Sequence, residues 1–184
     1  MKIAVLGGTG KEGSGLAFRW ALKGHDVTLG SRDAAKAAAG AQELNGLLAG
    51  KATVKGAGNR DAAAQAEIVV LAVPFAAQQA TALDVKNVLT GKILIDVTVP
   101  LVPPKVDRVQ LPNGESAVVA LQRALGEGVK VVSAFQNVSA VHLKEADHAV
   151  DCDVLVCGDD RDAKAVVIGL AKDAGMRAWD AGPL

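Results

Sequence analysis

Residues 2–22 read KIAVLGGTGKEGSGLAFRWAL, and this stretch decides the fold class. It passes from a short apolar run typical of a buried strand, through glycines at Gly8, Gly10 and Gly13, into an amphipathic segment typical of a helix. The spacing G-x-G-x-x-G after a strand and before a helix is the pattern of a dinucleotide-binding loop. In that pattern the first glycine permits a tight turn, the second lets the backbone approach a pyrophosphate, and the third lets the helix pack on the strand. The stretch therefore predicts a strand, a phosphate-binding loop and a helix in that order.

The loop is expected to hold a diphosphate through its backbone amides and the N-terminus of the helix. The coenzyme-binding residues that we expect in this loop are Gly8, Thr9, Gly10, Lys11, Glu12 and Gly13. A nucleoside triphosphate loop is disfavoured, because Lys11 is followed by Glu12 instead of serine or threonine and Val5 occupies the place of the leading glycine.

The rest of the chain alternates short β-rich runs with longer alanine-rich segments of helical period. This alternation predicts an α/β fold of the Rossmann type, a doubly wound and mostly parallel sheet with helices on both faces. Strands are expected at Lys2 to Leu6, Asp26 to Gly30, Thr53 to Lys55, Ile68 to Ala72, Lys92 to Val97, Val129 to Ala134, Asp153 to Cys157 and Arg177 to Trp179. Helices are expected at Gly13 to Lys23, Ala34 to Leu48, Asp61 to Ala66, Ala76 to Leu89, Ser116 to Leu125, Ala140 to Ala146 and Ala163 to Ala174. Since no repeat or low-complexity tract divides the chain, we expect residues 1–184 to form a single domain.

The segment after the second expected strand indicates which dinucleotide binds. An NAD site usually carries an acidic residue there, about 20 residues after the glycines, which binds the ribose 2′-hydroxyl. Here Ser31 and Arg32 place a hydroxyl and a guanidinium at the strand tip, and Lys36 follows one helical turn later. These groups suit a 2′-phosphate and favour NADP. Two alternatives remain open: Ser31 could cap the helix beside solvated cations, or the carboxylate of Asp33 could reach an unphosphorylated ribose.

Composition narrows the class of protein. The 184 residues are 50% hydrophobic and 22% charged, with 20 basic and 20 acidic side chains. This balance offers no cationic field for a nucleic acid or an anionic membrane, and no apolar run is long enough to cross a bilayer. Neither nucleic acid nor membrane is therefore expected as a partner. A reducing, cytoplasmic location is expected, because two cysteines cannot build a disulfide framework and the N-terminus has no secretory pattern.

Residue types also bear on the chemistry. The sequence contains no tyrosine, which excludes dehydrogenases that depend on a tyrosine general acid. The histidines His25, His142 and His148 lie on separate segments, and the odd spacing of Cys152 and Cys157 in an expected strand points their thiols to opposite faces. We therefore expect no metal site.

One long connection, Thr98 to Glu115, carries four prolines and an Asn-Gly turn that oppose both helix and central strand. It is either an inert crossover or a lid over a site at the edge of the sheet. Long loops inside compact domains are often functional, so we favour the lid.

Five stretches together resemble the coenzyme F420-dependent NADP reductases, and the resemblance runs the length of the chain. They are KIAVLGGTGKEGSGLA (2–17), GSRDAAKA (30–37), VVLAVPF (69–75), VVSAFQNVSA (131–140), and the pair VDCDVLVCGDD (150–160) and DAGPL (180–184). The resemblance implies an oxidoreductase that passes a hydride between the nicotinamide of NADP and the 5-deazaflavin ring of coenzyme F420, usually as a homodimer. The helices that usually follow DAGPL in this family are absent from the chain.

The resemblance also implies roles for particular residues. Thr9, Ser31, Arg32 and Lys36 would hold the 2′-phosphate side of NADP, and Gly10 to Gly13 would lie under the diphosphate. The residues expected near the nicotinamide and its acceptor are Ala72, Val73, Pro74, Phe75, Val99, Ala134, Gln136 and Asn137.

These residues follow the carboxyl ends of the expected strands, where α/β sheets bind ligands. Gln136 stands where many family members carry a histidine. With Asn137 it could bond a ring carbonyl or cap a following helix. No catalytic side chain is expected, and Asp96 is assigned no acid or base role, because direct hydride transfer depends mainly on positioning. The alternatives are an NADPH-dependent reductase of a flavin or small carbonyl compound, and a non-catalytic NADP-binding module.

Overall fold

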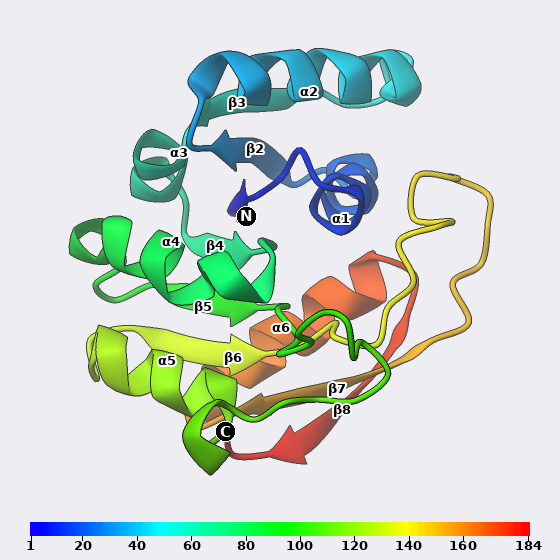
Figure 1. Ribbon diagram of the computed structural model, residues 1–184. Helices are drawn as coiled ribbons and strands as arrows, with labels where there is room; N and C mark the ends of the chain where they lie inside the picture. The colour runs from blue at the N-terminus through cyan, green and yellow to red at the C-terminus, as the bar shows by residue number, and fades with distance from the viewer.

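The computed structural model describes residues 1–184, apart from the side chain of Asn113. Within these residues one sheet has the strand order β3-β2-β1-β4-β5-β6-β7-β8 (Figure 1). All neighbouring strands are parallel except the antiparallel pair β6 and β7. The order reverses between β1 and β4, as in doubly wound dinucleotide-binding sheets, and the predicted fold class is confirmed. The strands are β1 (Lys2–Leu6), β2 (Asp26–Ser31), β3 (Val54–Gly58), β4 (Ile68–Leu71), β5 (Ile93–Asp96), β6 (Lys130–Ser133), β7 (Asp153–Gly158) and β8 (Arg177–Gly182).

Helices cover both faces of the sheet (Figure 1). Ile3 and Val5 of β1 belong to the core shared with α1, α2 and α6, whereas Ala4 and Leu6 belong to the core shared with α3, α4 and α5. Because β1 is covered on both sides, its apolar run is unbroken instead of alternating. The helices are α1 (Lys11–Leu22), α2 (Ala34–Leu48), α3 (Asn59–Gln65), α4 (Gln78–Asp84), α5 (Ala117–Leu125) and α6 (Arg161–Asp173), with 3₁₀ turns η1 (Phe75–Ala77), η2 (Lys86–Val88) and η3 (Pro112–Gly114).

Trp20 of α1 connects distant parts of the larger core. It is fully buried, its ring lies edge-on to Phe135 at 5.9 Å, and its Nε1 donates to the carbonyl of Leu170 at 2.8 Å. Both polar and apolar parts of the side chain are satisfied, so Trp20 joins α1 to the end of β6 and to α6.

The single helix predicted at Ala76 to Leu89 is wrong, because the structure divides this segment into η1, α4 and η2. Val85 leaves the helical region with φ −103° and ψ 3°. The break falls in the run from Asp84 to Val88, where β-branched residues, Asp and Asn have weak helix propensity.

The helix predicted at Ala140 to Ala146 is also wrong. These residues form turns, and the carbonyls of Leu143 and Glu145 accept hydrogen bonds from the side chain of Arg19, at 2.8 and 2.7 Å. A donor from α1 therefore replaces the amide partners that a helix would supply, which a local sequence pattern cannot reveal.

The segment from Thr98 to Glu115 is irregular apart from η3 and an isolated bridge between Val102 and Lys105, as its prolines predict. Among the described residues, the structure contains no helix of the length and apolarity needed to span a bilayer.

Candidate functional site

The phosphate-binding loop leaves β1 where the strand order reverses. Gly7 has a positive φ of 76°, its amide donates to the carbonyl of Gly30 at 3.1 Å, and the amide of Gly8 donates to the carbonyl of Val5 at 3.0 Å. The loop is thus fastened to both β1 and β2. The tight turn that the sequence pattern assigned to Gly8 belongs to Gly7, where an L side chain would be strained.

The other glycines are required for different reasons. A Cβ at Gly8 would lie 2.6 Å from the carbonyl oxygen of Val5, and one at Gly13 would lie 2.9 Å from that of Gly7. A Cβ at Gly10 would meet only the Gly7 oxygen, at 3.3 Å. Gly8 and Gly13 are therefore demanded by packing, whereas the Gly10 position opens outward and leaves room for a bound group.

Helix α1 begins directly behind this opening. Gly10 is its N-cap, no described side chain caps it, and the first amide to bond back to Gly10 is that of Ser14, at 2.9 Å. The amides of Lys11, Glu12 and Gly13 are left for an external acceptor, and the helix dipole adds positive potential. This arrangement can bind a diphosphate.

A continuous cleft extends from the loop along the tips of β2, β3 and β4. One cavity of about 520 Å³ and one of about 230 Å³ share Ser31, Arg32, Asn59, Ala77 and Thr81. The first also includes Gly58, Arg60, Asp61, Ala80 and Asp84, and the second includes Gly7, Thr9, Gly10, Ala72, Val73 and Pro74. The cleft therefore brings together Thr9, Gly10, the pair Ser31 and Arg32, and the β4 tip, as the sequence predicted.

The N-cap of α2 bears on the two alternatives at the β2 tip, which are a helix cap by Ser31 and a ribose contact by Asp33. Asp33 Oδ1 accepts from the amides of Ala35 and Lys36, at 2.9 and 3.3 Å, and Ser31 Oγ accepts from the Asp33 amide at 3.2 Å. Asp33, not Ser31, is the N-cap of α2. Lys36 is exposed on the first turn of α2 and, among the described residues, is not one that lines the cleft.

The β4 tip supplies an apolar wall. Ala72, Val73 and Pro74 line the smaller cavity, and Phe75 begins η1 directly after them. A further cavity of about 240 Å³ lies at the ends of β5 and β6, under the irregular segment. Its lining residues are Asp96, Thr98, Val99, Pro100, Val109, Leu111, Ser116, Ala117, Val118, Ser133 and Gln136. The segment from Thr98 to Glu115 thus covers a cavity at this edge, which favours the lid over an inert crossover.

A polar network forms the floor of this further cavity. Gln78 Nε2 donates to Asp96 Oδ2 at 2.6 Å and to Thr98 Oγ1 at 2.9 Å, and the Thr98 amide donates to Asp96 Oδ1 at 3.1 Å. Burial raises the pKa of Asp96, and these bonds from Thr98 and Gln78 oppose the rise. Asp96 therefore holds the start of α4 and the lid in place, and no acid or base role is needed for it.

The side chains of the residues that follow β6 point in different directions. Gln136 Nε2 donates to the carbonyl of Asp96 at 2.7 Å and to Ser133 Oγ at 2.9 Å, while Asn137 Nδ2 donates to the carbonyl of Asp153 at 2.9 Å. Ala134 is fully buried. Of these three, Gln136 lines the cavity, whereas Asn137 ties the chain to β7.

Two buried oxygens in the loop and cleft have no hydrogen-bond partner among the described residues: Glu12 Oε1 and Asn59 Oδ1. Burial raises the pKa of Glu12 to about 7. Asn59 lines both shared cavities, but its Oδ1 is buried and faces Gly30, where a Cβ would lie 3.0 Å from it. The opening at Gly10 and the free amides of the first turn of α1 together fit the diphosphate of a dinucleotide.

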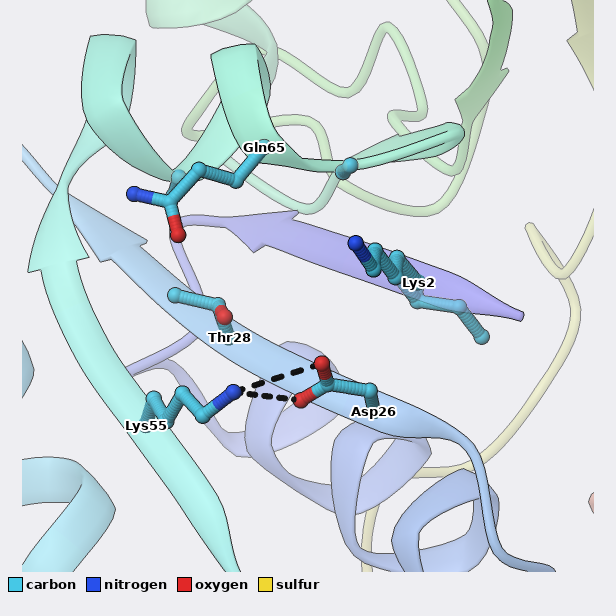
Figure 2. Close-up of a pocket in the computed structure, with 8 residues that line it drawn as sticks. Lys2, Asp26, Thr28, Lys55 and Gln65 are labelled. Atoms are coloured by element: carbon cyan, nitrogen blue, oxygen red, sulfur yellow. Dashed lines mark hydrogen bonds and ion pairs between the residues drawn. The ribbon is translucent and has the colours of Figure 1, made fainter.

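A separate hollow, of about 210 Å³, lies near the amino ends of the strands (Figure 2). Lys55 Nζ and Asp26 Oδ1 form an exposed ion pair of 2.9 Å across it, beside Lys2, Thr28 and Gln65 (Figure 2). Ligands of open α/β sheets bind at the opposite, carboxyl edge. We therefore place the functional site in the cleft at the carboxyl edge.

Comparison with known proteins agrees with this geometry. Residues 2–100 match the family described as "NADP oxidoreductase coenzyme F420-dependent". The F420-dependent NADP reductase of Methanothermobacter marburgensis is 45% identical over 190 residues, covering 100% of this chain and 85% of the relative. That of Methanocaldococcus jannaschii is 42% identical with the same coverage. The chain belongs to the F420-dependent NADP oxidoreductase family.

A solved structure supports the same relationship in three dimensions. The crystal structure of a protein from Arthrobacter sp. FB24, described as an F420-dependent NADP reductase, is 34% identical with a TM-score of 0.81. It aligns with 100% of this chain, which covers 85% of the Arthrobacter chain. Sequence and fold therefore agree on membership of the F420-dependent NADP oxidoreductase family.

In this member of the F420-dependent NADP oxidoreductase family, sequence reasoning missed Gly7, Asn59, Arg60 and Thr81. Gly58 lies in register with Ser31, so the residues after β3 emerge beside those after β2. The signal was present, since GNR at 58–60 repeats the arrangement of GSR at 30–32, a glycine followed by a polar residue and an arginine. Thr81 carries no comparable signal, because only the packing of α4 brings it to the cleft.

Proposed function

We propose that this protein transfers a hydride between NADP(H) and the 5-deazaflavin coenzyme F420, as an NADPH-dependent F420 reductase. The observation that carries the proposal is the β2 tip, where Ser31 and Arg32 line the cleft while the neighbouring Asp33 is committed to capping α2. Asp33 uses its Oδ1 in this cap, and the hydroxyl and forked cation beside it suit a phosphorylated ribose.

The chain's own residues divide the binding of NADP between them. The amides of Lys11, Glu12 and Gly13 hold the diphosphate, Gly10 leaves room for it, and Thr9 lies beside it. Ser31 and Arg32 hold the 2′-phosphate, and Arg60 lines the same cavity and adds a second guanidinium. Lys36 is retained as a peripheral cation.

The apolar tip of β4 orients the nicotinamide. Ala72, Val73, Pro74 and Phe75 offer a rigid wall with few polar atoms, so one face of the ring is shielded from water. The bound coenzymes supply the hydride donor and acceptor. The protein positions the two coenzyme rings and excludes water from them. A site of this kind needs no catalytic acid or base.

The acceptor is proposed to lie at the ends of β5 and β6. Val99 and Gln136 line the cavity there, Ala134 supports it from the core, and Asn137 anchors the chain behind it to β7. Gln136 uses its amide nitrogen within the protein, so its side-chain oxygen is the group available to a ligand. The segment from Thr98 to Glu115 closes over this cavity and excludes water.

The chain is proposed to act as a single NADP-binding domain in a cytoplasmic homodimer. Leu155 and Trp179 support the dimer, because they are paired in register on β7 and β8 and are 59% and 57% exposed. Large apolar side chains in adjacent positions are typical of surfaces that another chain covers.

The decisive experiment is anaerobic mixing of the protein with NADPH and oxidised coenzyme F420. Loss of the visible absorption of the deazaflavin is expected, with NADH much less effective. Hydride transfer to FMN or to a small carbonyl compound, without transfer to coenzyme F420, would show that the acceptor is not coenzyme F420. Tight NADPH binding with no transfer to any acceptor would indicate a non-catalytic module and would contradict the proposal.

A further inference from the structure

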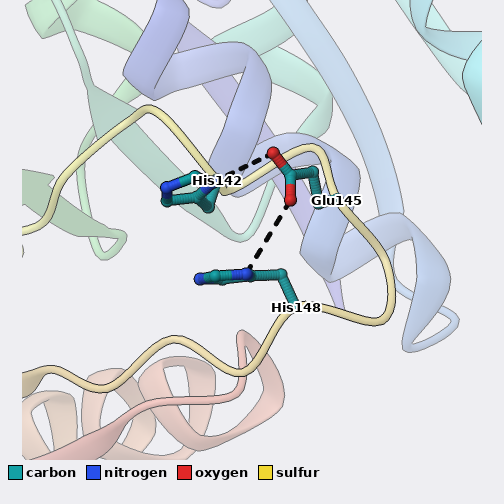
Figure 3. Close-up of side chains that lie close together, drawn as sticks. All are labelled: His142, Glu145 and His148. Carbon is teal, nitrogen blue, oxygen red and sulfur yellow. Dashed lines mark hydrogen bonds and ion pairs between the residues drawn. The ribbon is translucent and has the colours of Figure 1, made fainter.

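Three potential metal ligands come together outside the coenzyme cleft, on the turns between β6 and β7 (Figure 3). His142 Nδ1 lies 2.9 Å from Glu145 Oε1, and His148 Nδ1 lies 3.8 Å from Glu145 Oε2. The two imidazole rings stack at 4.2 Å with 23° between their planes. The sequence assigned His142 and His148 to separate segments and predicted no metal site, whereas the turns bring the two side chains together.

The buried side chain of Arg19 fixes the backbone that carries these three side chains. Arg19 is 8% exposed, and its guanidinium donates to the carbonyls of His142 at 3.1 Å, Leu143 at 2.8 Å, Glu145 at 2.7 Å and His148 at 2.9 Å. The carbonyls of all three potential ligands thus face inward. Their side chains are left on the outer surface, where all three are exposed.

Leu143 provides a second anchor for the same turns. It is fully buried against α1, and a Cβ at Gly15 would lie 2.5 Å from the Leu143 Cβ. The absence of a side chain at Gly15 therefore leaves the space in which Leu143 packs, and this packing fixes the turns against α1. A ligand set on such a backbone loses less conformational entropy on binding than one on a free loop.

The three groups are placed for one ion. Their ligand atoms all lie within 4.8 Å of one another, whereas ligands around a tetrahedral ion are roughly 3.3 Å apart given bonds of about 2.0–2.2 Å. Rotation of exposed side chains can close this difference. Arg19 bonds carbonyls and leaves the Glu145 carboxylate facing the imidazoles.

We infer that His142, Glu145 and His148 form a binding site for a divalent transition cation of the Zn²⁺, Cu²⁺ and Ni²⁺ class. Two imidazole nitrogens and one carboxylate oxygen favour these ions over Mg²⁺ and Ca²⁺, which prefer oxygen ligands. Three protein ligands leave at least one coordination position open to water. Binding would join the two histidines across the turns and stiffen the connection between β6 and β7.

The test is calorimetric titration of the full-length, untagged chain with Zn²⁺. One ion per chain is expected to bind, and His142→Asn and His148→Asn are each expected to weaken binding at least tenfold. The matched control is His25→Asn, which removes a histidine bonded to Asp173 at 2.8 Å and is expected to leave Zn²⁺ affinity unchanged. Cys152→Ser and Cys157→Ser control for thiol binding.

A second readout separates ligation from a structural effect of the substitutions. Bound Cu²⁺ is expected to show coupling to two imidazole nitrogens by electron paramagnetic resonance, and to one nitrogen in either single variant. Absence of binding at millimolar Zn²⁺, binding that survives in the double histidine variant, or binding that is lost in a cysteine variant would each overturn the inference. NADPH titration plays no part in these measurements, so the inference does not depend on the proposed function.

Discussion

Asp33 Oδ1 accepts a hydrogen bond of 2.9 Å from the backbone amide of Ala35. This carboxylate is the group that could otherwise bind an unphosphorylated ribose. The carboxylate caps α2 through Oδ1, and the hydroxyl of Ser31 and the guanidinium of Arg32 line the cleft beside it. The preference for a phosphorylated ribose therefore depends on a helix cap as well as on a cation.

Arg32→Ala is expected to weaken NADPH binding about 10- to 100-fold and to leave NADH binding nearly unchanged, because a charged hydrogen bond to phosphate contributes about 1.5–3 kcal/mol. Titration of both coenzymes measures the difference. Arg161→Ala, on the first turn of α6, is the matched control and should change neither affinity. An equal loss of affinity for NADPH and NADH in the Arg32 variant would show that Arg32 does not bind the 2′-phosphate.

Gly10→Ala and Gly8→Ala are expected to fail in different ways. The Gly10 position has φ −74° and a Cβ there would meet only the Gly7 carbonyl oxygen, at 3.3 Å, so alanine should lower the melting temperature much less than at Gly8 while weakening NADPH binding at least tenfold by crowding the diphosphate. Alanine at Gly8 meets the Val5 carbonyl and the Leu29 side chain and should cost about 1–3 kcal/mol of stability. Thermal melts and titrations on both variants check the pair. Unimpaired binding by the Gly10 variant would contradict the placement of the diphosphate.

Glu12 should make stability depend on pH. The folded pKa is about 7 and the ordinary value is 4.5, so between these values the unfolded chain has released a proton that the folded chain keeps. Stability from this group is complete below about pH 4.5 and is lost as the pH rises towards 7. The free energy of unfolding of Glu12→Gln should therefore be about 1–2 kcal/mol higher than that of the wild type at pH 8, after allowance for partial exposure. At pH 5 the two free energies should differ little. Urea unfolding at both pH values measures this, and an equal gain at both would point to a cause other than ionisation.

Arg19→Met is expected to lower the free energy of unfolding by about 2–4 kcal/mol, because several carbonyls lose a charged donor at once. The turns from residue 140 to 150 should then open first. Limited proteolysis should cut there in the variant and leave the wild type intact. Cleavage confined to other regions would show that Arg19 does not hold these turns.

Local pattern and distant contact explain which parts of the molecule could be predicted. The order of strands and helices, the glycine loop and the pair Ser31 and Arg32 follow from periodicity and turn chemistry, which operate over a few residues. The turns after β6 could not be predicted, because Arg19 holds them from 124 positions away in the chain.

The same distinction applies inside the site. Gly8 fits the motif, but Gly7 makes the turn, because the position of the β2 carbonyl at Gly30 decides where the chain reverses. Asn59 enters the cleft only because β3 pairs in register with β2. His142 and His148 meet because residues 141–147 form turns, whereas the sequence predicted a helix from Ala140 to Ala146 and placed the histidines on separate segments.

The antiparallel pairing of β6 with β7 separates two tasks along the chain. A connection between antiparallel neighbours returns to the edge it left, so the arch from Ala134 to Cys152 lies at the carboxyl edge of the sheet, and its Gln136 lines the proposed acceptor cavity. The nucleotide, by contrast, is gripped entirely by loops that precede β5. Exchanging the segment from Thr98 to Glu115 together with Gln136 should therefore change which molecule receives the electrons while leaving the choice of nicotinamide coenzyme as it is.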